Sequence, residues 1–203
     1  YVNAGTFEFL VDLGRGDGDD TPFYFLEMNT RLQVEHPVTE QVTGVDMVRA
    51  QLLVASGLPL PWTQASLTQR GHAIEARIYA EDPSQAFIPQ AGPLLLYREP
   101  RLPGVRVDSG FREGDQVPVH YDALLAKVIA TAETRELATA RLRQALRAFP
   151  ILGIRTNIRF VSVDHPPRSI AHVAHGFTVN LRECLAFRSR LLHLFIKRPA
   201  ISA

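Results

Sequence analysis

Polar side chains of types that can do chemistry occupy every second position in one short stretch of the sequence. The five residues are Glu27, Asn29, Arg31, Gln33 and Glu35. In an extended chain, residues two apart lie on the same face, so these side chains would line one wall at intervals of about 6.5 Å. A strand with a solvated polar face produces the same alternation, and the period alone favours that interpretation.

The chemical types of the five side chains favour a binding site instead. The carboxylate of Glu27 and the amide of Asn29 offer the oxygen ligands that a hard cation prefers. The guanidinium of Arg31, with the amide and carboxylate that follow it, suits a small anion and its proton. Pro37 lacks a backbone N–H and is expected to close the extended run.

Two strands should position the first part of this wall. Residues 5–10 and 23–28 flank the glycine–aspartate segment 14–20, so we expect a β-hairpin that brings Glu8 within reach of Glu27. Beyond the wall, Thr43 as N-cap with Asp46 three residues later predicts a helix that ends before Gly57. Residues 59–69, which contain two prolines, are the expected boundary of a second unit.

The second unit should be a compact antiparallel sheet with a helix. Its strands are separated by proline and glycine and are expected at residues 71–83, 93–98, 105–109, 117–120 and 123–131. Residues 134–149 are expected to form a helix whose apolar face includes Ala138, Leu142, Ala145 and Phe149, stopped by Pro150. Thr156 opens a shorter helical stretch.

Composition excludes several classes of protein. The 203 residues include 22 basic and 21 acidic side chains, a balance that argues against nucleic acid as the main partner. No run of 18 apolar residues occurs, so we expect no membrane span. The single cysteine, Cys184, cannot form an internal disulfide, which fits a reducing compartment.

Residues 23–40 resemble the signature of biotin carboxylase, the ATP-grasp component of acyl-CoA carboxylases, pyruvate carboxylase and urea carboxylase. The stretch reads FYFLEMNTRLQVEHPVTE. Its Glu-x-Asn part recurs across ATP-grasp enzymes, whereas the extension at residues 31–37, RLQVEHP, is far more specific. The likeness continues from Tyr1 to about Phe160, and it includes the segment at residues 71–83.

This resemblance implies an α+β fold. Residues 1–60 would be the C-terminal part of an ATP-grasp domain. Residues 67–165 would be the biotin carboxylase C-terminal domain, a mixed and mainly antiparallel sheet with helices. Residues 166–203 follow the family poorly and are treated as a divergent tail.

The resemblance also implies a reaction, with ATP, Mg²⁺ or Mn²⁺, and biotin as cofactors. ATP and bicarbonate would give carboxyphosphate and ADP, and the carboxyl group would then pass to N1 of biotin on a carrier domain outside this chain. Metal binding falls to Glu8, Glu27 and Asn29. ATP binding falls to Glu8, Leu10 and Glu27.

The remaining site residues implied by the resemblance serve bicarbonate and biotin. Bicarbonate would be bound by Arg31, Gln33, the Val34 backbone N–H and Arg106. Glu35 would be the general base that takes the bicarbonate proton. Arg106 would meet the ureido oxygen of biotin and stabilise its enolate form, so that Arg31, Glu35 and Arg106 are the catalytic residues.

The implied partners are the biotin carboxyl carrier domain and a carboxyltransferase subunit or domain, and the full-length protein would be a homo-oligomer. The compartment would be the cytoplasm of a bacterium or the mitochondrial matrix of a eukaryote.

Other features indicate a piece of a longer protein. The sequence opens within an expected strand and has no glycine-rich phosphate loop and no lysine pair for the ATP phosphates, so the chain alone is expected to be inactive. Two alternatives stay open. One is another ATP-grasp ligase such as a carbamoyl-phosphate synthetase, against which residues 31–37 and 71–83 argue. The other is a non-catalytic remnant that retains a subunit-pairing surface.

Overall fold

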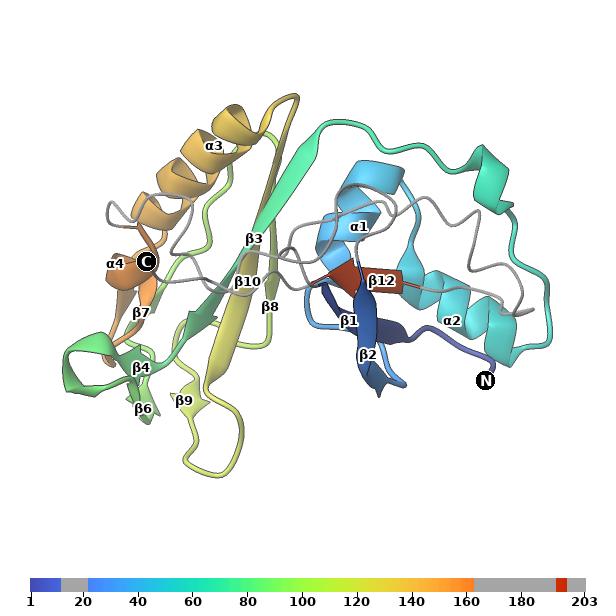
Figure 1. Cartoon of the computed structure of the whole chain (residues 1–203). Coiled ribbons are helices and arrows are strands. Elements are labelled where there is room, and N and C mark those ends of the chain that lie inside the picture. The colour runs from blue at the N-terminus through green and yellow to red at the C-terminus, as the bar shows by residue number, and fades with distance from the viewer. Residues whose placement is uncertain (12–21, 163–192, 197–203) are drawn as a thin grey trace. The chain divides into compact units, whose positions relative to one another are not determined.

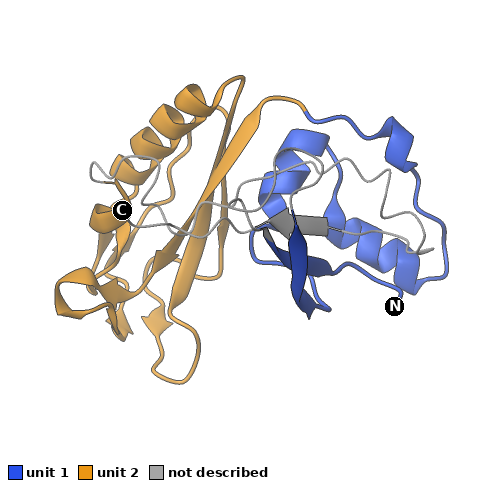
Figure 2. Ribbon diagram, viewed as in Figure 1, with its two compact units in different colours: residues 1–69, 175–203 blue, residues 70–174 orange. Residues whose placement is uncertain are grey.

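The computed structural model describes residues 1–11, 22–162 and 193–196 (Figure 1). The chain divides into two compact units, which comprise residues 1–69 with 175–203 and residues 70–174 (Figure 2). Each unit is described by itself below. The glycine–aspartate segment 14–20, Cys184 and most of the tail at 166–203 lie outside the described residues.

The first unit is built around the predicted hairpin. Strands β1 (Thr6–Val11) and β2 (Phe23–Asn29) pair antiparallel, with Glu8 directly opposite Glu27. A register shift after Glu8 places Phe9 opposite Phe25. The Phe9 ring packs edge-to-face against Phe23 and Phe25, with ring centroids 5.5 and 6.0 Å apart. On its other edge β1 pairs in parallel with β12 (His193–Ile196).

The expected extended wall does not continue past Asn29, so that part of the prediction is wrong. Strand β2 ends at Asn29, and helix α1 (His36–Thr43) begins only seven residues later. Glu35 has φ −82° and ψ 10°, which is not an extended conformation. Pro37 lies in the first turn of α1, where its missing N–H breaks no helical hydrogen bond.

The expected start of the next helix is also wrong by a few residues. Thr43 is the last residue of α1, which Gly44 ends with φ 75°, a conformation that favours glycine. Helix α2 (Met47–Ala55) is capped by Asp46, whose side chain accepts a hydrogen bond from Arg49 N at 2.8 Å. Gly57 follows the C-cap with φ 75°, as predicted. The short η2 helix (Gln64–Ser66) completes the described part of this unit.

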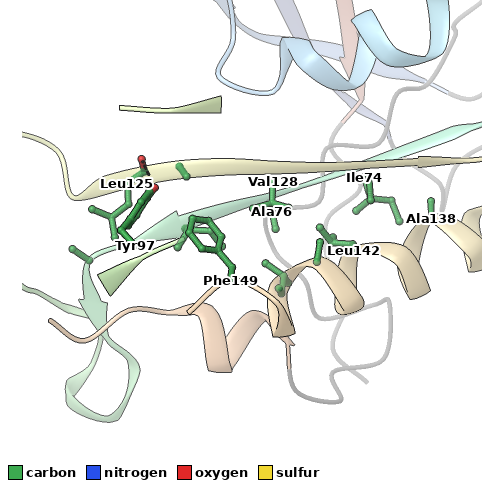
Figure 3. Close-up of a cluster of buried hydrophobic side chains, with 14 of the residues drawn as sticks. Ile74, Ala76, Tyr97, Leu125, Val128, Ala138, Leu142 and Phe149 are labelled. Carbon is green, nitrogen blue, oxygen red and sulfur yellow. Dashed lines mark hydrogen bonds between the residues drawn. The ribbon is translucent and has the colours of Figure 1, made fainter. Parts of the chain in front are cut away.

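The second unit contains the predicted antiparallel sheet. Its three strands are β3 (His72–Tyr79), β10 (Leu124–Ala132) and β8 (Val105–Ser109), with β10 in the middle. Helix α3 (Arg135–Arg147) packs on one face and is capped by Thr134. The buried core includes Ile74, Ala76, Val128, Ala138 and Leu142, and Figure 3 shows the helix residues directed at the strands. The α+β fold class is confirmed.

Several smaller elements surround this sheet. They are β4 (Glu81–Asp82) with β5 (Ile88–Pro89), β6 (Gly92–Pro93) with β9 (Gln116–Val117), β7 (Leu96–Tyr97) with β11 (Ile151–Leu152), the η3 turn (Pro83–Gln85) and α4 (Ile158–Ser162). The strand expected at 93–98 is therefore split in two, and the strand expected at 117–120 is reduced to its first residue. None of the helices in the described ranges is long and apolar enough to cross a membrane.

Asn157 completes the hydrogen bonding of the edge strand β3. Its side chain accepts from Tyr79 N at 2.9 Å and donates to Arg77 O at 3.1 Å, and its own N–H donates to Tyr79 O at 3.1 Å. The residue is buried, so these groups have lost water as an alternative partner. Asn157 thus acts as a short additional strand and joins α4 to the sheet.

Replacing Asn157 with alanine should destabilise the second unit by about 1–3 kcal/mol, because buried backbone groups lose their partners. Urea unfolding followed by circular dichroism measures this change. Gln144→Ala, at an exposed position on α3, is the control and should stay within about 0.5 kcal/mol of the parent. An Asn157→Ala midpoint equal to that of the control would contradict the role given to this side chain.

Candidate functional site

Two carboxylates of the hairpin converge on one amide nitrogen. Glu8, which is buried, lies opposite Glu27 in the β1–β2 register. Asn29 Nδ2 donates to Glu8 Oε1 at 3.2 Å and to Glu27 Oε1 at 3.1 Å. Like charges directly opposite each other on neighbouring strands repel. The N–H groups of Asn29 therefore supply the partial positive charge that holds this arrangement together.

The same amide joins the carboxylates to a guanidinium. Arg31 Nη2 donates to Asn29 Oδ1 at 3.3 Å, and Arg31 Nη1 donates to Gln33 Oε1 at 2.7 Å and to Leu32 O at 3.3 Å. The predicted row of polar groups is thus contiguous from Glu8 to Gln33. Its first part, Glu8, Glu27 and Asn29, lies on the strands as predicted. Arg31 and Gln33 come after the end of β2 and are joined to Asn29 by side-chain hydrogen bonds, whereas the sequence predicted that the strand would continue.

A small recess lies beside Arg31 and Gln33, and Gly5 and Thr6 also line it. Gly5 keeps this region tight: a Cβ at this position would lie 3.2 Å from Asn29 O and 3.2 Å from the Tyr1 ring. His36 closes the turn through Nδ1, which lies 2.7 Å from Gln33 O. Because a carbonyl oxygen only accepts, Nδ1 carries the proton.

Val34 and Glu35 occupy the turn between Gln33 and α1. Glu35 is half-buried at the N-cap position, and its carbonyl accepts from Val38 N at 3.1 Å, but its side chain does not cap the helix. Glu35 is therefore close in the chain to Arg31 but does not lie on a common strand face with it. The reason is that the backbone leaves the extended conformation after Asn29.

Leu10 lies on β1, two residues beyond Glu8 and opposite Tyr24. Its side chain is 44% exposed, so this position faces solvent or a ligand and contributes little to the core.

Arg106 belongs to the second unit, and only its surroundings within that unit are described. On β8, Arg106 Nε donates to Asp108 Oδ1 at 2.7 Å, and Nη2 donates to Asp108 Oδ2 at 2.9 Å. Lys127 Nζ on β10 lies 3.4 Å from Asp108 Oδ2. Burial alone would raise the pKa of Asp108, but hydrogen bonding and the positive charges of Arg106 and Lys127 lower it below the ordinary value.

Sequence reasoning missed Asp108 and Lys127. The available signal was the Arg-x-Asp spacing at Arg106, since residues two apart on a strand share a face. Lys127 required the strand register, which the sequence does not give.

The side-chain oxygens of Glu8, Glu27 and Asn29 fit a hard cation, provided that the Asn29 amide turns over. Among the described residues, no three Asp, Glu, His or Cys side chains gather as a metal cluster. A cation between Glu8 and Glu27 would therefore use their two carboxylates and the amide oxygen of Asn29. That oxygen points to Arg31, so the amide would have to turn over before Oδ1 could serve as a ligand.

Comparison with known proteins agrees with this division into two units. Residues 1–63 match the sequence model of the carbamoyl-phosphate synthase L chain ATP-binding domain. Residues 75–166 match that of the biotin carboxylase C-terminal domain.

Known relatives and solved structures belong to carboxylases. The chain is 49% identical over 162 residues to the mitochondrial methylcrotonoyl-CoA carboxylase subunit alpha of Rattus norvegicus, covering 79% of this chain and 22% of the relative. It is 50% identical over 159 residues to the biotin carboxylase of Allochromatium vinosum, covering 78% of this chain and 34% of the relative.

A similar fold is found in the biotin carboxylase domain dimer of Hydrogenobacter thermophilus 2-oxoglutarate carboxylase, solved with MgADP, ADP and bicarbonate. The TM-score is 0.68 at 42% identity, covering 71% of this chain and 32% of that chain. The chain thus spans about a fifth to a third of the length of these proteins.

Fold and sequence together define a chain with the end of an ATP-grasp domain followed by a biotin carboxylase C-terminal domain. The chain belongs to the biotin carboxylase family. The C-terminal match and these relatives argue against the alternative of a carbamoyl-phosphate synthetase.

Proposed function

We propose that this chain forms part of a biotin carboxylase, which uses ATP and bicarbonate to carboxylate N1 of carrier-bound biotin through carboxyphosphate. The observation that supports this most directly is the hydrogen-bonded row from Glu8 through Asn29 and Arg31 to Gln33. It places a carboxylate pair beside a guanidinium, as required by a reaction that joins a metal-bound phosphate to a small anion.

The carboxylate end of the row is proposed to bind the metal and the nucleotide. Glu8, Glu27 and Asn29 would hold Mg²⁺ or Mn²⁺, and Leu10 would contact ATP. The cation supplies charge neutralisation on the phosphate oxygens during phosphoryl transfer. Glu8 is well suited to a fixed ligand because its side chain is buried and tied to Asn29.

The guanidinium end is proposed to bind bicarbonate. Arg31 offers a planar set of donors that matches an oxyanion, and Gln33 and the Val34 N–H add neutral donors. Glu35, half-buried in the next turn, would accept the bicarbonate proton as general base. Hydrogen bonding between Arg31 and Gln33 at 2.7 Å holds both side chains in one orientation before the anion arrives.

Arg106 is proposed to act later in the reaction. Its cation would stabilise the oxyanion that develops on the biotin ureido oxygen when N1 is carboxylated. Contact with bicarbonate in the earlier step is the alternative role, and the Arg106→Ala comparison below separates the two. Its position on β8 ties its side chain to a sheet with a buried core.

The partners follow from this proposal. They are a biotin carboxyl carrier domain, a carboxyltransferase subunit or domain, and further copies of the full-length protein. The compartment would be the bacterial cytoplasm or the mitochondrial matrix.

Exposed large apolar residues on β2 favour a larger assembly over an independent enzyme. Phe23, Tyr24, Phe25 and Leu26 are 50–65% exposed on a strand at the edge of its sheet. Exposed strands of this composition favour pairing with further protein.

The metal assignment predicts that Glu27→Gln in the complete enzyme weakens Mn²⁺ binding in the presence of ADP by about 10- to 100-fold, a loss typical of damage to a metal site. Electron paramagnetic resonance of free Mn²⁺ measures the affinity. Glu99→Gln, an exposed glutamate of the second unit, is the control. Equal affinity in both variants would remove Glu27 from the metal site.

Glu35→Gln in the complete enzyme should lower bicarbonate-dependent ATP cleavage by about 10²- to 10⁴-fold, because the general base is lost. Mn²⁺ binding should persist, since Glu35 lies outside the carboxylate pair. Steady-state ADP release measures the rate. A kcat close to that of the parent enzyme would show that another group takes the proton.

Arg106→Ala should reduce carboxylation of free biotin far more than bicarbonate-dependent ATP hydrolysis, because Arg106 acts after carboxyphosphate has formed. Arg98→Ala removes an exposed arginine that pairs with Glu113 at 3.6 Å in the same unit, and it should change neither rate. Equal losses of both activities in Arg106→Ala would assign Arg106 to bicarbonate or to a structural ion pair.

The 203-residue chain by itself should show no carboxylase activity. Phosphoryl transfer depends on positioning and electrostatics, and the sequence has only two lysines, of which Lys127 is paired with Asp108. The assay mixes the chain with ATP, Mg²⁺, bicarbonate and biotin and follows ADP, with a complete biotin carboxylase in parallel. Turnover comparable to that of the complete enzyme would contradict this expectation.

A further inference from the structure

Arg106 is held along one edge of its guanidinium group by Asp108. The two hydrogen bonds, of 2.7 and 2.9 Å, use both carboxylate oxygens and two different guanidinium nitrogens. Residues two apart on a strand share a face, so both side chains lie on the side of β8 opposite Val105 and Val107, which pack against the core. A planar group held at two points is fixed in its plane and in the direction of its remaining donors.

Lys127 offsets the charge that Asp108 brings to this arrangement. It lies opposite Asp108 in the β8–β10 register, with Nζ 3.4 Å from Oδ2. Within this group of three, two cations and one anion leave a net positive charge. On the same face, Arg77 of β3 lies opposite Lys127, and Glu75 lies opposite Ile129. Without Lys127, the carboxylate would cancel the charge of the arginine that it orients.

The end of β8 that carries Asp108 is itself anchored. The next residue, Ser109, has its hydroxyl 2.7 Å from the hydroxyl of Tyr97. Tyr97 is buried against Phe149, and burial raises the pKa of its hydroxyl to about 12. The carboxylate of Asp108 is thus attached to a strand that the core fixes in place.

We propose that Asp108 is a positioning residue, which orients the Arg106 guanidinium toward the developing oxyanion, and that Lys127 maintains the positive charge of the pair. This inference rests on the proposed function, in which Arg106 meets the ureido oxygen of biotin. An oxyanion donor is effective only when it lies about 2.7–3.1 Å from the position of the charged oxygen. A long side chain reaches that accuracy when a second group restricts its rotamers.

The test compares two activities of the complete enzyme. Asp108→Ala should lower the kcat for carboxylation of free biotin by about 10- to 100-fold, a loss on the scale of a misplaced oxyanion donor. Bicarbonate-dependent ATP hydrolysis and the melting temperature should stay close to those of the parent. Asp108→Glu, which keeps a carboxylate within reach of the guanidinium, should recover part of the lost rate.

Asp115→Ala is the matched control. Asp115 also pairs with an arginine of the same unit, Arg112, at 3.6 Å, but it lies outside the Arg106 cluster. Its replacement should leave carboxylation unchanged.

A double variant separates the possible outcomes. If Asp108 acts through Arg106, Arg106→Ala with Asp108→Ala should be no slower than Arg106→Ala alone. Multiplicative losses in the double variant, or equal loss of both activities in Asp108→Ala, would overturn the positioning role. A normal rate in Asp108→Ala beside a slow Arg106→Ala would overturn this inference alone. A normal rate in Arg106→Ala would overturn the function proposed for Arg106 and the inference with it.

Discussion

The first unit depends on two carboxylates that face each other across a hairpin. Directly opposed side chains on paired strands have Cβ atoms about 5 Å apart, so Glu8 and Glu27 require positive charge between them. Asn29 supplies it with its amide N–H groups, and its oxygen then accepts from Arg31. The amide therefore links the carboxylate pair on the strands to the first residues after β2. The turn that follows places Glu35 at the N-cap position of α1.

The second unit holds the guanidinium group of Arg106 at two points through Asp108. Helix α3 buries one face of the β3–β10–β8 sheet, so the side chains of Arg106 and Asp108 are left on the opposite face of β8. Lys127 comes from the central strand and joins them only because of the antiparallel register. One face of this sheet is therefore covered by the apolar core, and the other face carries the charged cluster of Arg106, Asp108 and Lys127.

The sequence predicted most of the regular elements and the identity of the polar row, but it did not predict the path of that row. The hairpin that pairs Glu8 with Glu27 was predicted from two strand-like stretches around a glycine–aspartate segment. The buried face of the 134–149 helix was predicted from the helical spacing of its apolar residues. Alternation cannot distinguish a strand from a turn that side chains hold together. Pro37 can end a strand or open a helix, and here it lies in the first turn of α1. The Asp108–Lys127 contact depends on register, which no local pattern encodes.

The central proposal is that Glu8, Glu27 and Asn29 hold the metal beside Arg31, which requires the Asn29 amide to turn over. A crystal structure of the complete enzyme with Mn²⁺, ADP and bicarbonate tests it directly, with anomalous scattering to locate the metal. The account predicts Mn²⁺ between Glu8 and Glu27, with Asn29 Oδ1 turned toward it, and bicarbonate on the guanidinium of Arg31. A metal bound elsewhere, with Asn29 Nδ2 still bridging the two carboxylates, would contradict the account.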